Sequence, residues 1–342
     1  MGVVVCFGEV MMRLCPPGYL RLSQTDKLEM TFGGAECNVS VSLANYGMKA
    51  RYVTRLPENP LTDAFLYQMR GFGVDVDYVV KGGDRFGIYF VEKGASMRPS
   101  KVVYDRKYSS ISTAQVGDID WDKVFEGATW FHWTGITPAL SDSAAALTLE
   151  ACKAAKAKGI TISCDLNYRK NLWSREKAKE VMTELVKYVD VMIANEEDSK
   201  DVFGIAAEGT DIETGKLSEA GYRDLAKKLS ATFGAKKVAF TLRESFSAND
   251  NNWSALLYDA ATDSAVRSRQ YAIHIVDRVG GGDSFGGGLI YALSNGYSDE
   301  DAINFAAAAS ALKHTIEGDF NRVSLDEVKK LMNGSASGRV QR

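Results

Sequence analysis

The sequence predicts an α/β protein with a mainly parallel central sheet and a small, separate sheet that serves as a lid. The continuously apolar run at residues 3–7 is typical of a strand that is buried on both faces. Further strand-like runs alternate with helical patterns, and this alternation favours parallel strands joined by crossover helices. Residues 88–93 and 102–107 depart from it, because they resemble two antiparallel strands around a turn at 94–100. We expect this hairpin to form the lid.

The length and composition of the chain narrow the choice of partners. Its 342 residues are enough for one large domain with a small appendage. A net charge of −3 argues against nucleic acid or an anionic membrane as a partner. No apolar run approaches the roughly 20 residues of a membrane span. The apolar start is interrupted by Glu9 and Arg13 and lacks a cleavage site, so no secretory signal is expected.

The cysteines and histidines show no metal-binding spacing. The five cysteines form no C-x-x-C pair, and their odd number and apolar neighbours predict buried, reduced thiols in a cytoplasmic protein. They are Cys6, Cys15, Cys37, Cys152 and Cys164. We expect structural roles for the three histidines, which are His132, His274 and His314.

The clearest functional signal is the glycine run at residues 280–282. It follows a β-branched, strand-like segment at 271–276 and precedes a small, apolar, helical segment at 284–293. Backbone without Cβ atoms can come close to a ligand, and the N–H groups at a helix N-terminus attract anions. The run therefore predicts a binding site for a phosphate group.

Asp283 turns this binding site into a catalytic hypothesis. A carboxylate repels a resting phosphate, but it suits a site where a substrate hydroxyl lies between it and a transferable phosphoryl group. Asp283 would take the hydroxyl proton while the loop amides stabilise the moving phosphoryl group. A role as helix N-cap is compatible with this one. The loop is neither a Walker loop nor a dinucleotide loop, since the chain has no G-x-x-x-x-G-K-[ST] and position 285 is Phe.

Other polar segments lie at predicted strand ends or helix starts. Gly33 and Gly34 precede a small-residue helix and allow either a close ligand or a plain structural turn. The strand at 161–169 ends in polar residues, and ligands of parallel sheets bind beyond such ends. Residues 195–198 are consistent with water-mediated contact to Mg²⁺ or with an acidic helix start.

Two arginines indicate that the ligand is an acid. Alternation along the lid strands places Tyr104 and Arg106 on one face, and Tyr89 can join them from the neighbouring strand. An acid ligand needs a cation, and the planar guanidinium group matches a carboxylate. Arg106 and Arg169 stand at predicted ligand positions, and Arg13 lies near the first strand.

These motifs resemble those of the ribokinase-like (phosphofructokinase B) family of sugar kinases over the whole chain. The most specific match is Asp277-x-x-Gly-Gly-Gly-Asp283, with Gly281 where the family usually has Ala, and Gly33-Gly34 with Asn38 is a second. Within the family, the similarity is greatest to the kinases that act on 2-keto-3-deoxygluconate. It rests on residues 33–36, Tyr89, Tyr104-x-Arg106, 134–139 and 165–169.

The resemblance implies a ribokinase-like three-layer α/β/α fold with a mainly parallel central sheet and a β-sheet lid. The expected core comprises residues 1–13, 33–77 and 113–332, and the expected lid comprises 14–32 and 78–112. Residues 333–342 are expected to form a mobile tail. An exposed lid sheet also favours a homo-oligomer, a dimer or higher.

The resemblance also implies a role for each matching residue. Asp283 would be the catalytic base, and Gly280, Gly281 and Gly282 would form the anion hole. The expected contacts of the sugar acid are Gly34, Tyr89, Tyr104, Arg106, Ile136, Arg169, Asp277 and Asp283. The expected ATP contacts are Thr241, Arg243, Gly280, Gly282, Ala309 and Lys313, with Arg243 where many members have glycine. Asn195 and Asp198 would match the Asn-x-x-Glu metal motif, with a shorter carboxylate arm.

The expected reaction is phosphorylation of the 6-hydroxyl of 2-keto-3-deoxygluconate, with ATP and Mg²⁺ as cofactors. A kinase for another sugar or nucleoside remains an alternative within the same family. A non-catalytic sugar-acid sensor is an alternative of another class, although Asp283 and the intact glycine run argue against it. The sequence does not separate the gluconate substrate from its galactonate epimer.

Overall fold

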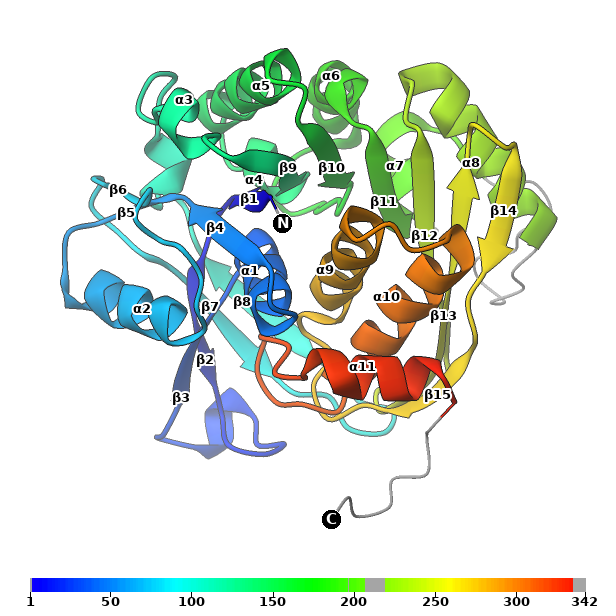
Figure 1. Cartoon of the computed structure of the whole chain (residues 1–342). Coiled ribbons are helices and arrows are strands. Elements are labelled where there is room, and N and C mark those ends of the chain that lie inside the picture. The colour runs from blue at the N-terminus through cyan, green and yellow to red at the C-terminus, as the bar shows by residue number, and fades with distance from the viewer. Residues whose placement is uncertain (1, 196, 207–218, 335–342) are drawn as a thin grey trace.

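The chain folds around a nine-stranded sheet with helices on both faces (Figure 1). The computed structural model describes residues 2–195, 197–206 and 219–334. The strand order is β14-β13-β12-β11-β10-β9-β1-β4, and β15 pairs with β13. Pairing is parallel from β4 to β12 and antiparallel from β12 onward. The bounds are β1 (Val3–Phe7), β4 (Lys49–Val53), β9 (Ala128–Thr134), β10 (Thr161–Asp165), β11 (Val191–Asn195), β12 (Lys237–Ser245), β13 (Asp250–Asp259), β14 (Ser264–Arg267) and β15 (Tyr271–His274).

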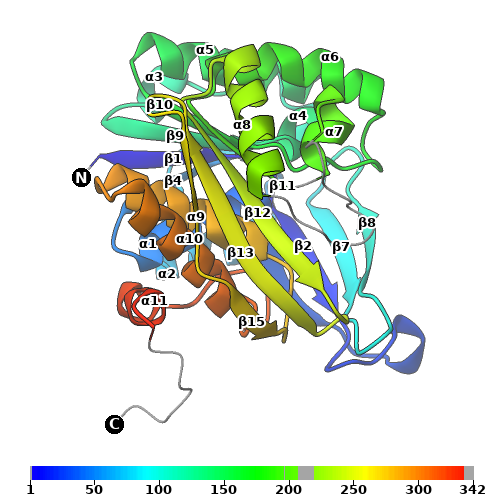
Figure 2. The same ribbon diagram turned by 90° about the vertical axis from the view of Figure 1, so that its right-hand side faces the viewer.

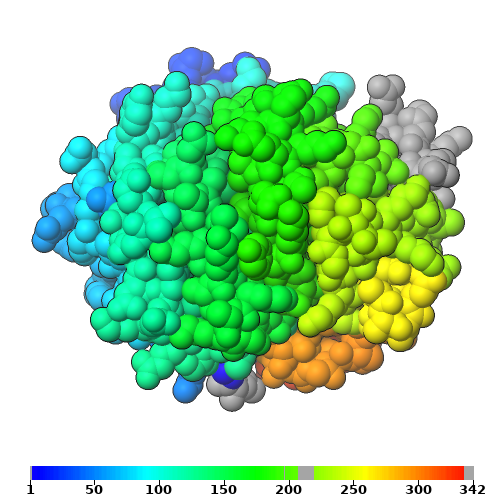
Figure 3. All heavy atoms as spheres, turned by 90° about the horizontal axis from the view of Figure 1, so that it is seen from above, coloured from blue at the N-terminus to red at the C-terminus, as the bar shows by residue number. Residues whose placement is uncertain are grey.

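Two apolar cores lie on the two faces of this sheet. Alternate residues of β1 point to opposite faces, so Val4 belongs to one core and Val5 to the other. The first core contains residues of α1 (Ala35–Asn45), α2 (Pro60–Gly71), α9 (Gly281–Ser294), α10 (Asp299–Lys313) and α11 (Leu325–Met332). The second contains residues of α3 (Trp121–Val124), α4 (Ile136–Ala139), α5 (Asp142–Ala157), α6 (Arg175–Leu185), α7 (Asp198–Phe203) and α8 (Glu219–Phe233). Figure 3 shows α5 and α6, in green, covering the middle of that second face.

A second, four-stranded sheet forms the lid, in the order β3-β2-β7-β8. Its strands are β2 (Met11–Cys15), β3 (Glu29–Gly33), β7 (Gly87–Glu92) and β8 (Lys101–Asp105), and Figure 2 shows β7 and β8 beside the core. The expected antiparallel hairpin is confirmed by the pairing of β7 with β8. The expected boundary is wrong by a few residues, because β2 already begins at Met11 and pairs only within the lid sheet. A further two-stranded sheet joins β5 (Arg55–Leu56) to β6 (Val80–Lys81).

The tip of the lid is fastened to the core by hydrogen bonds. Ser96 lies in the turn after β7, and its N–H donates to Asn249 Oδ1 at 2.7 Å. The N–H of Ala248 donates back to the carbonyl oxygen of Ser96 at 2.8 Å. Both partners belong to the turn that connects β12 and β13, so the lid rests on this turn.

The expected states of the cysteines and of His132 can be compared with the described residues, whereas most of the expected tail, residues 335–342, lies outside them. All five cysteines are buried and free of disulfide bonds. His132 is buried and its Nδ1 lies 2.8 Å from Ser163 Oγ, and burial lowers its pKa to about 3, so a structural role fits. Within the described ranges, no helix has both the length and the apolar character needed to cross a membrane.

Candidate active site

The glycine run lies, as predicted, at the N-terminus of a helix. Gly280 is the N-cap of α9 with φ +84°, and a Cβ there would lie 2.0 Å from the carbonyl oxygen of Asp319. A Cβ on Gly281 would lie 2.4 Å from the ring of His314, whereas one on Gly282 would meet nothing within 4 Å. Packing therefore requires the first two glycines, and only Gly282 leaves open space beside the helix start. No side chain of the N-cap residue caps this turn, so its amides suit an anion.

Asp283 lies in the first turn of α9 and is held by a neighbouring helix. Asn38 Nδ2, in α1, donates a hydrogen bond to Asp283 Oδ2 at 2.6 Å. Burial raises the pKa of Asp283 to about 6, the bond from Asn38 opposes this rise, and the charge of Asp319 adds to it. A carboxylate with a pKa near neutrality suits proton transfer at physiological pH. Asn38 was noted in the sequence only as part of a motif, and its contact with Asp283 was not predicted.

The first glycine pair is required by packing as well. Gly34 is the N-cap of α1, and a Cβ on it would lie 2.0 Å from the carbonyl oxygen of Glu9. A Cβ on Gly33 would lie 2.0 Å from Asp319 Oδ2. Of the two interpretations of this pair, the structure supports the turn. Contact between Gly34 and a substrate stays a prediction.

Glu36 joins the start of α1 to the end of β9. Its Oε1 accepts hydrogen bonds from Thr134 N at 2.9 Å, Thr134 Oγ1 at 2.9 Å and Thr137 Oγ1 at 2.8 Å. Burial raises the pKa of Glu36 to about 7, and the hydrogen bonds it accepts oppose the rise. These bonds fix the backbone on both sides of Ile136, a half-buried residue that was expected to contact the sugar.

Tyr89 and Tyr104 face the same side of the lid, as predicted. They are paired across β7 and β8, and their rings stack with centroids 6.1 Å apart. The Arg106 guanidinium lies 5.2 Å from the centre of the Tyr104 ring, so the third predicted residue joins them. Tyr89 is buried and its hydroxyl donates to Asp319, whereas Tyr104 is 41% exposed and remains open to a ligand.

Arg106 is already paired, which the sequence did not predict. Its Nη2 donates to Glu9 Oε2, and Ser109 Oγ donates to Glu9 Oε1 at 2.5 Å. Arg106 is 8% exposed, and its buried Nε has no hydrogen-bond partner. A buried donor without a partner is costly, so this atom is suited to an incoming acceptor. Glu9 therefore orients Arg106 and uses part of its charge.

Arg169 lies close to the predicted base. It is exposed, and its charge lowers the pKa of both Asp283 and Asp165. Asp165 ends β10, and its pKa is raised above the usual value, first by burial and then by the charges of Asp198 and Asp283. The sequence placed polar groups at this strand end, and the structure brings them near Asp283.

Asn195 and Asp198 form a hydrogen-bonded helix start. Asn195 Oδ1 accepts from the N–H groups of Glu197 at 2.8 Å and Asp198 at 3.0 Å. The Asp198 carboxylate accepts from Asn195 N at 3.2 Å and Tyr168 N at 3.0 Å. Since these oxygens already accept backbone bonds, a directly coordinated Mg²⁺ fits poorly here. Within the described residues, no group of three or more His, Cys, Asp or Glu side chains could hold a metal. A water-mediated role stays a prediction.

The predicted ATP contacts fall into two groups. Thr241 is half-buried and Arg243 is exposed on β12. Burial lowers the pKa of Arg278 and His314, next to the glycine run, and the charge of Arg243 adds to this effect in both. This position suits the phosphates of a nucleotide. Ala309 and Lys313 are fully buried in α10, and contact between them and ATP stays a prediction. Ala309 packs against Gly288 of α9, where an added Cβ would lie 3.2 Å from it.

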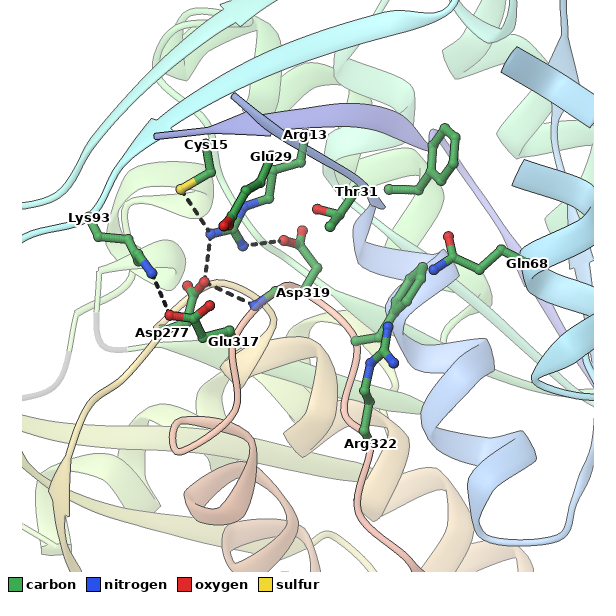
Figure 4. Close-up of a pocket in the computed structure, with 13 residues that line it drawn as sticks. Arg13, Cys15, Glu29, Thr31, Gln68, Lys93, Asp277, Glu317, Asp319 and Arg322 are labelled. Atoms are coloured by element: carbon green, nitrogen blue, oxygen red, sulfur yellow. Dashed lines mark hydrogen bonds and ion pairs between the residues drawn. The ribbon is translucent and has the colours of Figure 1, made fainter. Parts of the chain in front are cut away.

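The Asp277 side chain is 2% exposed and forms hydrogen bonds inside the protein. Its Oδ2 accepts from Arg13 Nη2 at 2.5 Å and from Gly318 N at 3.1 Å, and Arg13 Nη1 donates to Asp319 at 2.7 Å (Figure 4). Arg13 and a backbone amide use this carboxylate oxygen, and contact between Asp277 and the sugar stays a prediction. A cavity of about 120 Å³ lies beside these hydrogen-bonded residues, and Gln68 also lines it.

Comparisons with known proteins agree with this geometry. Residues 1–322 match the family model described as pfkB family carbohydrate kinase. A crystal structure of 2-dehydro-3-deoxygluconokinase from Thermotoga maritima is 49% identical, with a TM-score of 0.94 over 98% of this chain and 100% of that one. A 2-dehydro-3-deoxygalactonokinase from Haloferax volcanii is 33% identical over 98% of both chains. A 2-dehydro-3-deoxygluconokinase from Bacillus subtilis is 28% identical over 93% of this chain and 91% of the relative.

Proposed function

Because the chain belongs to the pfkB family of carbohydrate kinases, we propose that it transfers a phosphoryl group from ATP to the 6-hydroxyl of 2-keto-3-deoxygluconate. This sugar acid is the 2-dehydro-3-deoxygluconate in the names of its relatives from Thermotoga maritima and Bacillus subtilis. The observation that carries the proposal is Asp283, a carboxylate with a pKa of about 6 at the open N-terminus of α9. A passive phosphate site has no use for such a group.

Asp283 acts as the general base in this proposal. Asn38 holds one carboxylate oxygen at 2.6 Å, which fixes the direction in which the carboxylate faces the substrate hydroxyl. Asp283 takes the proton from the substrate hydroxyl while the hydroxyl oxygen attacks the phosphoryl group. The amides of the first turn of α9, beside Gly282, stabilise the negative charge on that group.

Two cations lie near the other predicted contacts of the substrate. Arg106 presents a buried Nε without a partner, and Arg169 lies close enough to lower the pKa of Asp283. A guanidinium group can give a carboxylate two parallel hydrogen bonds, which a neutral sugar cannot use in the same way. We therefore assign recognition of the acid group to these two residues.

ATP and Mg²⁺ complete the proposed reaction. The ion, when bound with the nucleotide, would neutralise charge on the β- and γ-phosphates. Thr241, Arg243 and the glycine run form the proposed nucleotide wall, and Asn195 and Asp198 would act on the ion through water. This metal role rests on their position at the end of β11 and the start of α7.

A second substrate is favoured by one comparison. The relative from Haloferax volcanii is named for the galactonate epimer, which differs in the orientation of one hydroxyl. We place the gluconate first because the structure from Thermotoga maritima is more similar, at 49% against 33% identity.

A coupled assay of ADP release tests the proposal. We expect the highest kcat/KM with 2-keto-3-deoxygluconate, a lower value with the galactonate epimer, and far lower values with fructose and ribose. Higher kcat/KM with a neutral sugar would refute the assignment, and no turnover with any sugar would favour the sensor. The buried free thiols support a reducing, cytoplasmic setting. The exposed β8 edge, with Val103 at 54%, supports a homo-oligomer, which light scattering can measure.

A further inference from the structure

Lys313 is a fully buried lysine at the end of α10. Its Nζ donates to the carbonyl oxygen of Asp277 at 3.2 Å and to that of Ile316 at 3.1 Å. Asp277 lies in the loop before α9, and Ile316 lies in the loop after α10. The backbones of these two loops touch at Gly280, where a Cβ would lie 2.0 Å from the carbonyl oxygen of Asp319. One ammonium group therefore joins the two loops that shape the start of α9.

The charge of Lys313 is surrounded by the carboxylates of the site. Burial lowers the pKa of Lys313, the charges of Asp277, Asp319 and Asp283 oppose this, and that of Arg13 adds to it. Burying an ammonium group is costly unless it is paired and hydrogen-bonded. A neutral side chain of the same length would fill the space at no such cost, so the charge itself calls for an explanation.

We propose that Lys313 is an internal cation that positions the glycine run and its base. With its two carbonyl bonds in place, the loop at 277–280 and the loop at 314–319 keep a fixed spacing. The first-turn amides of α9 and the Asp283 carboxylate then face one point, where the transferred group must lie. Lys313 touches no substrate, so it is a positioning residue. This inference rests on the proposed kinase function and deepens it.

The cation also acts on the base through space. Lys313 lowers the pKa of Asp283, together with the bond from Asn38 and the charge of Arg169, while burial and Asp319 raise it. Asp165, at the end of β10, also faces Asp283. Without the charge of Lys313, Asp283 keeps its proton to a higher pH. Loss of activity at low pH then begins at a higher pH, which a purely structural contact would not cause.

Two substitutions separate these effects in the coupled assay. Lys313→Met keeps the length but removes charge and donors, and we expect kcat to fall by about 10- to 100-fold, as misplaced reacting groups do. The acid limb of the pH profile should move to higher pH. Lys313→Ala should lose similar activity but leave space for a small cation. Ammonium or methylammonium chloride should restore part of its kcat, with tetramethylammonium chloride as the ionic-strength control.

The matched controls decide the outcome. Ammonium should not rescue Lys313→Met, in which the methionine fills the space, and Lys187→Met on the exposed surface should resemble the wild type. A wild-type kcat and an unchanged acid limb in Lys313→Met would overturn the proposal. Ammonium should also raise the Tm of Lys313→Ala. If ammonium changes neither the kcat nor the Tm of this variant, the proposal is likewise overturned. Inactivity of the wild type on every sugar would instead refute the kinase assignment, while the Tm measurement still tests Lys313.

Discussion

Asn38→Ala should shift the pH dependence of the enzyme. Asn38 Nδ2 donates to Asp283 Oδ2 at 2.6 Å, and this bond holds the pKa of the base below the value that burial alone would impose. The bond stabilises the charged carboxylate, so its removal raises the pKa. Asp283 must be deprotonated to accept the hydroxyl proton. As the pH is lowered, the variant should therefore begin to lose activity at a higher pH than the wild type does.

The size of this shift follows from the strength of such bonds. A hydrogen bond to a charged group contributes about 1.5–3 kcal/mol, which corresponds to roughly one to two pH units. Water that replaces the Asn38 amide will recover part of this, so we expect a shift of about one unit. Starting from a pKa of about 6, the acid limb should move to around pH 7. At pH 8.5 the kcat/KM of Asn38→Ala should be much closer to that of the wild type than at pH 6.

The measurement is kcat/KM against pH from 5 to 9 for the wild type, Asn38→Ala and Asn45→Ala. Asn45 is a matched control, because it lies in the same helix and its Nδ2 donates to the backbone of Asn321, away from Asp283. Asn45→Ala should reduce stability and leave the acid limb unchanged. Identical acid limbs in all three proteins would refute the assignment of Asn38 as the residue that sets the pKa of the base.

Three further predictions concern the base, the acid group and the ion. Asp283→Asn should lower kcat by about 10²- to 10⁴-fold with smaller changes in KM, and near-normal turnover of the folded variant would remove it as the base. Arg169→Ala should raise the KM for 2-keto-3-deoxygluconate by roughly 10- to 150-fold. A neutral analogue should be affected far less, Arg169→Lys should recover only part of the loss, and equal losses on both substrates would contradict the role. Asn195→Ala with Asp198→Ala should raise the Mg²⁺ concentration for half-maximal rate, and an unchanged titration would leave this segment as a helix start.

The sequence predicted the parts of the structure that depend on local patterns. The apolar run of β1, the lid hairpin and the glycine run before α9 each follow from neighbouring residues. Strand alternation predicted that Tyr89 and Tyr104 lie on the same side of the lid, and the structure pairs them across β7 and β8. The antiparallel strands β13 and β14 were not predicted, because their mixed sequences carry little of the period that marks a buried strand.

Contacts between distant segments could not be predicted from those patterns. Arg13 and Asp319 are 306 residues apart, and the local sequence around neither residue predicts their ion pair. The same holds for Glu9 and Arg106. The burial of Lys313 was not predicted for a related reason, since a motif gives the position of a residue but not the direction of its side chain. Burial within α10 decides that direction.

The pairing of Arg106 with Glu9 changes how recognition of the acid should be understood. A free arginine would attract any anion that enters the site, including a phosphate. Glu9 accepts a hydrogen bond from Nη2 of Arg106, and the other carboxylate oxygen of Glu9 accepts one from Ser109. The guanidinium group is therefore oriented and partly neutralised before a ligand arrives. The unpartnered Nε is then left for one acceptor that reaches it. Selection thus depends on where the carboxylate of the substrate lies, because a charge placed elsewhere gains little from an arginine that is already paired.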